Sequence, residues 1–128
     1  MKSSKSVLII EDEKQVRESI VDILQLKGYS TLEASDGTIG FELAKKHIPD
    51  VVLCDIMMPF MNGFETISKF KSNSLTKYIR FIFLTAKTES ENRKLGLDLG
   101  AAAYITKPFS VEDLIASIEG SSSREVSS

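Results

Sequence analysis

The 128-residue chain has the length of a single domain, and its 42% hydrophobic residues suffice for one core. Sixteen Lys and Arg against eighteen Asp and Glu leave a net charge of −2, which gives no general reason to bind nucleic acid or an anionic membrane. No apolar run approaches the roughly 20 residues that span a bilayer. Too few apolar residues follow the basic N-terminus for a signal peptide, so we expect a cytoplasmic location.

Short apolar runs alternate with amphipathic segments along the chain. The uninterrupted runs are typical of strands buried on both faces, and apolar residues between them recur at helical spacing. In chain order, the expected elements are a strand at 7–10, a helix around 16–24, a weaker edge strand at 30–34, a helix around 39–44, a strand at 51–54, a helix at 63–72, a strand at 81–84, a helix at 88–99, a strand at 102–105 and a helix at 110–119.

The alternation of five strands with five helices predicts an α/β fold. Its expected form is a doubly wound parallel sheet with right-handed crossovers and helices on both faces. Ser110 is predicted to cap the last helix, three residues before Asp113. We expect one domain over residues 1–120 and a flexible tail or linker at 121–128, because the sequence from residue 120 onward, "GSSSREVSS", has low complexity.

Polar side chains follow four of the predicted strands. Glu11 and Asp12 follow the first strand, Asp55 the third, Thr85 the fourth and Lys107 the fifth. Alone, each has an ordinary structural interpretation, such as a helix N-cap for Asp12. In a doubly wound sheet, however, they meet beyond the carboxyl ends of the strands, where carboxylates repel one another unless a cation joins them or their pKa values rise. Because Mg²⁺ binds one or two carboxylates, waters and phosphate oxygens, the pattern predicts a site for Mg²⁺ and an anion.

Four motifs stand in a fixed order along the chain: "IIEDE", "CDIMMPFMNG", "FLTAK" and "YITKPF". Together they resemble the response-regulator receiver domains of two-component signalling, of which the single-domain chemotaxis regulator is the simplest form. The resemblance extends from about residue 6 to residue 119. It implies the flavodoxin-like strand order 2-1-3-4-5.

The resemblance also implies roles for the acidic residues. Asp55 would be the phosphoacceptor, a carboxylate nucleophile that attacks the phosphorus of a phosphohistidine. Asp12 and Asp55 would bind Mg²⁺ directly, together with the backbone carbonyl of Met57. Glu11 would act mainly through metal-bound water.

Further roles fall on the ends of the last two strands. Lys107 would pair with one phosphoryl oxygen and Thr85 would donate its hydroxyl to another, because a loose phosphoryl-transfer transition state is helped mainly by positioning and charge neutralisation. The family implies a cis peptide bond between Lys107 and Pro108. It also implies a switch in which Tyr104 turns inward when Thr85 moves onto the phosphoryl group.

On this basis we expect a regulatory phosphoacceptor that catalyses only its own phosphorylation and dephosphorylation. The donor would be a sensor histidine kinase or a histidine phosphotransfer protein. A downstream protein or fused output domain would read the face formed by residues 88–99, 102–105 and 110–119. A phosphatase of the haloacid dehalogenase type is excluded, because its second Asp would stand where Met57 does. The alternative is a receiver-like docking module that works without phosphorylation.

One subgroup pattern of the family is missing. DNA-binding regulators that dimerise through this face usually carry acids just before the aromatic residue of the fifth strand and bases along the last helix. Here Ala102 and Ala103 precede Tyr104, and the helix "VEDLIASIE" has no Lys or Arg. We therefore expect a monomer that binds neither nucleic acid nor membrane through this domain.

Overall fold

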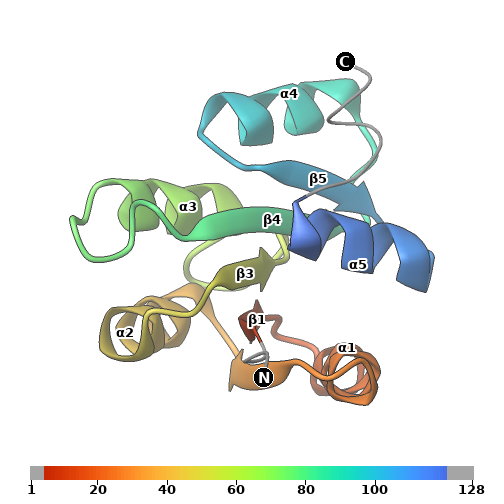
Figure 1. The fold of residues 1–128 in the computed structure, drawn as a ribbon. Helices are drawn as coiled ribbons and strands as arrows, with labels where there is room; N and C mark the ends of the chain where they lie inside the picture. The colour runs from red at the N-terminus through yellow and green to blue at the C-terminus, as the bar shows by residue number, and fades with distance from the viewer. Residues whose placement is uncertain (1–4, 121–128) are drawn as a thin grey trace.

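The computed structural model describes residues 5–120, in which five parallel strands alternate with five helices (Figure 1). The strands form one sheet in the order β2-β1-β3-β4-β5, which confirms both the doubly wound fold and the edge position of the second strand. The tail expected at 121–128 lies outside the described residues. The elements are β1 Ser6–Ile10, α1 Lys14–Leu26, β2 Ser30–Ala34, α2 Gly37–His47, β3 Val51–Cys54, α3 Gly63–Lys71, β4 Arg80–Thr85, α4 Ser90–Asp98, β5 Ala103–Thr106 and α5 Val111–Glu119.

The fourth helix and the fifth strand begin later than the sequence predicts. Glu89 has the extended backbone of an N-cap residue, so α4 starts at Ser90. After α4, the amide of Ala101 still donates to the carbonyl of Gly96 (3.1 Å) and thereby closes the helix end. The chain becomes free to pair with β4 only after this closure, and β5 starts at Ala103.

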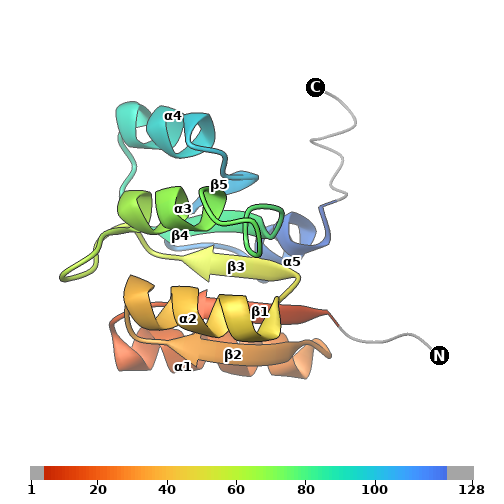
Figure 2. The same cartoon turned by 90° about the vertical axis from the view of Figure 1, so that its left-hand side faces the viewer.

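The sheet separates two apolar cores. Side chains alternate across a strand, so Leu8 and Ile10 of β1 enter one core while Val7 and Ile9 enter the other. Helices α2, α3 and α4 cover the first core, and α1 and α5 cover the second (Figures 1 and 2). Both faces of the central strands are thus buried, which explains their uninterrupted apolar sequences. Among the described residues, no helix has the length and apolar character needed to cross a bilayer.

Aromatic rings connect the first core to the carboxyl end of the sheet. Phe70 and Phe81 meet edge to face with ring centroids 5.2 Å apart, and Phe81 meets Phe83 in the same way at 5.3 Å. Phe83 in turn lies 6.1 Å from the ring of Tyr104. Because such pairs add about 0.5–1.5 kcal/mol each to the burial of their surface, they hold β4 and β5 firmly where those strands end.

Helix α4 is the least buried of the five helices described. Gly96 is its one buried residue, whereas each of the others buries three or four. A Cβ at Gly96 would lie 3.0 Å from the ring of Phe83 and 3.3 Å from that of Tyr104, so the helix backbone packs directly on these rings. Leu95 and Leu97 are left half-exposed. Helix α4 is therefore attached to the molecule mainly through one close backbone approach.

Candidate functional site

Backbone pairing brings the polar residues together at the carboxyl edge of the sheet. Ile10 pairs with Cys54, so Glu11 and Asp55 are the next residues on neighbouring strands. The amide of Asp55 donates to the carbonyl of Ile10 (3.1 Å). On the other side of the site, the amide of Lys107 donates to the carbonyl of Thr85 (2.8 Å). The ladder hydrogen bonds thus continue past the strands and fix the backbone of the site.

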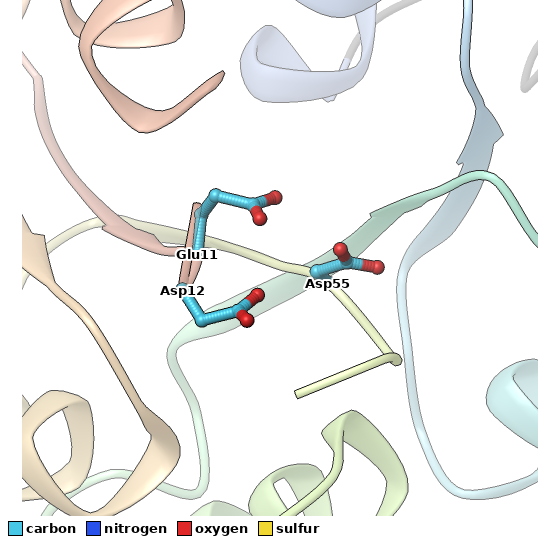
Figure 3. Close-up of side chains that lie close together, drawn as sticks. All are labelled: Glu11, Asp12 and Asp55. Carbon is cyan, nitrogen blue, oxygen red and sulfur yellow. The ribbon is translucent and has the colours of Figure 1, made fainter. Parts of the chain in front are cut away.

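Three carboxylates lie close together at this edge (Figure 3). Glu11, Asp12 and Asp55 each offer one carboxylate oxygen, and these atoms all lie within 4.8 Å of one another. Glu11 and Asp55 are buried, while Asp12 is half-buried. An all-oxygen set of this kind fits a hard divalent cation that keeps some of its waters, as Mg²⁺ does.

The ordinary interpretation of Asp12 as a helix cap is wrong. Glu13 takes the N-cap position of α1, and no side-chain hydrogen bond caps that helix end. The Asp12 carboxylate is therefore not engaged in capping α1, and it lines the same pocket as Asp55.

Lys107 offsets part of the negative charge. Its Nζ donates to Glu11 Oε1 (3.0 Å) and lies 3.5 Å from Asp55 Oδ2. Burial raises the pKa of the Glu11 carboxyl, and the hydrogen bond from Lys107 opposes this only in part. For the Lys107 ammonium, burial lowers the pKa, but the hydrogen bond to Glu11 and the charge of Asp55 outweigh burial and raise it. The ammonium thus stays charged within the acidic pocket.

The Asp55 carboxylate is held on one side and open on the other. Its Oδ1 accepts from the amides of Ile56 (2.7 Å) and Met57 (3.3 Å). A pocket of about 290 Å³ opens beside it, with room for a phosphoryl group and several waters at roughly 30 Å³ per water. The pocket is lined by Asp12, Glu13, Val16, Asp55, Met57, Ala86 and Lys107.

The turn after Asp55 depends on a glycine. A Cβ at Gly63 would lie 2.5 Å from the carbonyl oxygen of Asp55 and 2.7 Å from the Cα of Ile56, distances that no side chain tolerates. Asn62 and Glu65 form a capping box that starts α3 at this point. The first turn of α3 is thereby packed against the backbone that carries the candidate phosphoacceptor.

Thr85 and Tyr104 are linked through one residue of the β4–α4 connection. The hydroxyl of Thr85, which is fully buried, accepts from the amide of Lys87 (3.3 Å). The hydroxyl of Tyr104 donates to the carbonyl of the same Lys87 (2.8 Å). The Tyr104 side chain is thus buried against the β4–α4 connection. The Lys107–Pro108 peptide bond is cis.

Two arginines of this region were missed by the sequence reasoning. Arg93 of α4 lies over the ring of Tyr104, 5.6 Å from its centroid, and donates to the Tyr104 carbonyl (3.3 Å). Arg17 of α1 donates to the carbonyl of Glu11 (2.7 Å). Neither belongs to a local motif, because both reach their partners through the packing of a helix on the sheet.

Fold and site together define a doubly wound α/β domain with an acidic pocket and a half-buried lysine at the carboxyl edge of its sheet. Residues 7–119 match the model of the response regulator receiver domain, so the chain belongs to this family. Receiver domains are regulatory phosphoacceptor domains, as the sequence led us to expect.

Relatives of known name are found among both regulators and kinases. The phosphate regulon transcriptional regulatory protein PhoB of Pseudomonas aeruginosa is 40% identical over 115 residues, which are 90% of this chain and 50% of PhoB. Histidine kinase P4 of Formosa agariphila is 37% identical over 112 residues, which are 88% of this chain and 8% of that protein. The chain thus spans about half the length of PhoB.

Solved structures share the fold over most of the chain. The chemotaxis protein CheY4 of Vibrio cholerae superposes with a TM-score of 0.85 at 31% identity, covering 91% of this chain and 97% of CheY4. A response regulator receiver domain from Methanospirillum hungatei superposes with a TM-score of 0.84, also at 31% identity, covering 91% of this chain and 92% of that one. The match to CheY4 thus covers nearly the whole CheY4 chain.

Proposed function

We propose that Asp55 accepts a phosphoryl group from a phosphohistidine of a sensor histidine kinase or a histidine phosphotransfer protein. The supporting observation is the setting of its carboxylate, which faces a pocket with Lys107 Nζ 3.5 Å away and oxygens of Glu11 and Asp12 within 4.8 Å. A nucleophile, a cation-binding pair of acids and a fixed ammonium are the groups that phosphoryl transfer requires.

The proposed transfer is a displacement at phosphorus. A carboxylate oxygen of Asp55 forms the new O–P bond while the N–P bond of the phosphohistidine breaks, and the departing imidazole nitrogen keeps the electron pair and takes up a proton. Bound Mg²⁺ would neutralise phosphoryl charge, held by Asp12, Asp55 and the Met57 carbonyl directly and by Glu11 through water. The amides of Ile56 and Met57 keep the Asp55 carboxylate oriented.

Lys107 and Thr85 would then bind the transferred group. Lys107 Nζ would exchange its present contact with Asp55 for a phosphoryl oxygen, and the Thr85 hydroxyl would donate to another. Thr85 now accepts from the amide of Lys87, so a turn of its hydroxyl toward the phosphoryl group would weaken that contact. Because Tyr104 is bound to the same residue, the change would reach Tyr104. We propose that this link is the switch between the site and the surface formed by α4, β5 and α5.

The output surface is expected to meet a protein. On α4 it offers Leu95, Leu97 and Arg93, whereas the first turn of α5 carries Glu112 and Asp113. We propose a downstream protein or fused output domain as its partner, a monomeric receiver domain over residues 1–120, and a cytoplasmic location without nucleic-acid or membrane contacts of its own.

The test is to replace the phosphoacceptor while keeping its shape. Wild-type protein treated with acetyl phosphate and Mg²⁺ should show one phosphoryl adduct by intact-mass spectrometry, and Asp55→Asn should show none. Asp22→Asn on the exposed face of α1 is the matched control and should label like the wild type. A comparable adduct on Asp55→Asn would place the phosphoacceptor elsewhere.

The alternative is a docking module that is never phosphorylated. It predicts no adduct on the wild type and no change in amide chemical shifts when beryllofluoride and Mg²⁺ are added. The open Asp55 pocket favours the phosphoacceptor.

A further inference from the structure

Arg17 of α1 contacts the backbone of the acidic turn, residues 11–13. Its Nη1 donates to the carbonyl oxygen of Glu11 at 2.7 Å, a short charge-assisted hydrogen bond. Its Nε donates to Glu33 Oε1 of β2 at 3.2 Å. The side chain is only 15% exposed, so the guanidinium is packed between α1 and the edge of the sheet.

The carbonyl that Arg17 binds belongs to the peptide group joining Glu11 to Asp12. The last bond between β1 and β2 joins the amide of Glu11 to the carbonyl of Ala34 (3.0 Å), so the carbonyl of the Glu11–Asp12 peptide lies beyond the ladder. Because the peptide is planar, a hydrogen bond to its carbonyl restrains the orientation of the whole group and the positions of the Glu11 and Asp12 Cα atoms, which carry the two acidic side chains. The Glu11 carboxylate is also held on both oxygens, by Lys107 Nζ (3.0 Å) and by the amide of Glu13 (3.1 Å).

We propose that Arg17 is a positioning residue for the cation site, a proposal that rests on the function proposed above. Arg17 holds the Glu11–Asp12 peptide so that both carboxylates face the same space as Asp55, and Glu33 holds the guanidinium in place. The planar fork of arginine serves two acceptors at once, which the single ammonium of lysine does with less geometric control. Groups that orient metal ligands commonly change metal affinity by about 10–100-fold when they are removed.

Positioning and simple charge make opposite predictions for this residue. A guanidinium close to a cation site repels the cation, so loss of its charge alone would tighten Mg²⁺ binding. Loss of the hydrogen bond to the Glu11 carbonyl would instead let the acidic turn move and weaken binding. The sign of the change in Mg²⁺ affinity therefore distinguishes the two effects.

The experiment measures the Mg²⁺ dissociation constant by NMR titration of the amide shifts around the pocket. We expect Arg17→Ala to raise this constant about tenfold, and Arg17→Lys, which keeps the charge without the fork, to raise it by a smaller factor. Lys14→Ala is the matched control, because it removes a positive charge from the same helix at a site that is 75% exposed and paired with Glu18. The Mg²⁺ dissociation constant of this control variant should not rise.

Each outcome decides the proposal. If Arg17→Ala binds Mg²⁺ as tightly as the wild type or more tightly, Arg17 does not position the acids. Should Arg17→Ala fail to fold, Arg17→Lys decides alone, and an unchanged constant there overturns the proposal. A wild-type protein that binds no Mg²⁺ overturns the metal site itself, and the positioning role with it. By contrast, if the wild type binds Mg²⁺ and the Arg17 variants bind it equally tightly, only the positioning role is overturned.

Discussion

At the scale of single residues, Lys87 is the common partner of the two side chains expected to switch. The amide of Lys87 donates to Thr85 and its carbonyl accepts from Tyr104, so movement of either side chain changes a backbone hydrogen bond of the same residue. Arg93 adds a cation over the Tyr104 ring and a hydrogen bond to the Tyr104 carbonyl. The buried Tyr104 side chain is therefore held by the Lys87 carbonyl and by the Arg93 guanidinium over its ring.

Removing the Thr85 hydroxyl should separate phosphorylation from its transmission. Thr85→Ala should still accept a phosphoryl group at Asp55, because the nucleophile, the acids and Lys107 remain. The variant loses one hydrogen bond to the phosphoryl group, worth about 1 kcal/mol or somewhat more for a charged acceptor, and with it part of the bias between the two states. Amide shifts of α4, β5 and α5 on beryllofluoride addition should shrink, while those of the Asp55 pocket persist.

Thr88→Ala, at an exposed threonine, provides the control for that experiment. Its changes in amide shift on beryllofluoride addition should match those of the wild type. Undiminished shifts along α4 and β5 in Thr85→Ala would show that the surface responds without the Thr85 hydroxyl.

The site residues at strand ends could be predicted because each follows an apolar run. In a parallel sheet such positions lie at one edge whatever the details of packing, so Lys107 Nζ lies 3.5 Å from Asp55 Oδ2 and the Lys107 amide donates to the Thr85 carbonyl. Arg17 and Arg93 could not be predicted in this way. Each lies on a helix, and its partner depends on how that helix is rotated on the sheet and how far a long side chain reaches, which the periodicity of apolar residues does not specify.

At the scale of elements, the start of α3 depends on the absence of a side chain at Gly63. A Cβ there would overlap the backbone of Asp55 and Ile56, and moving this backbone strains the hydrogen bond from the Asp55 amide to the Ile10 carbonyl. We expect Gly63→Ala to lower the free energy of unfolding by about 1–3 kcal/mol. It should also slow phosphorylation by acetyl phosphate, since relief of the overlap displaces residues 55–62, the acceptor loop between β3 and α3. Chemical denaturation and the phosphorylation rate measure the two effects.

Gly28→Ala is a useful comparison for that variant. Gly28 has a φ of 93° but open space around its Cβ, so its substitution strains the backbone far from the site. It should lose stability without slowing phosphorylation. Equal slowing in both variants would mean that stability, and not the acceptor loop, limits the reaction.

The order of the elements was predictable, but their exact boundaries were not, as the starts of α4 and β5 show. The alternation of apolar runs with helical periodicity gave all ten described elements, because burial on both faces leaves an uninterrupted pattern in each central strand. The starts of α4 and β5 depend instead on the N-cap backbone of Glu89 and on the bond from Ala101 to Gly96. Hydrogen bonds that close a helix involve backbone atoms, which every residue has, so the sequence marks them weakly.

At the scale of the whole molecule, folding brings Asp55 next to Glu11 and Asp12, from which the unfolded chain separates it. Mg²⁺ should therefore bind the folded state and raise its stability, by about 2.7 kcal/mol at a concentration 100 times the dissociation constant. Calorimetry should show a higher melting temperature in MgCl₂ than in KCl of equal ionic strength. The increase should disappear in Asp12→Ala. If that variant gains as much from Mg²⁺ as the wild type, Asp12 is not a ligand.

The packing of α4 on a single glycine has a consequence for hydrogen exchange. Helices α3 and α4 both contain nine residues, but α3 buries four of them and α4 buries one. Because local opening exposes little apolar surface in α4, its amides should exchange with deuterium at a lower opening free energy than those of α3. Mass spectrometry of the two peptides compares them within one molecule, and equal protection would contradict this expectation. A partner that binds the α4 surface would slow exchange there, so the binding surface could be mapped without knowing the partner's identity.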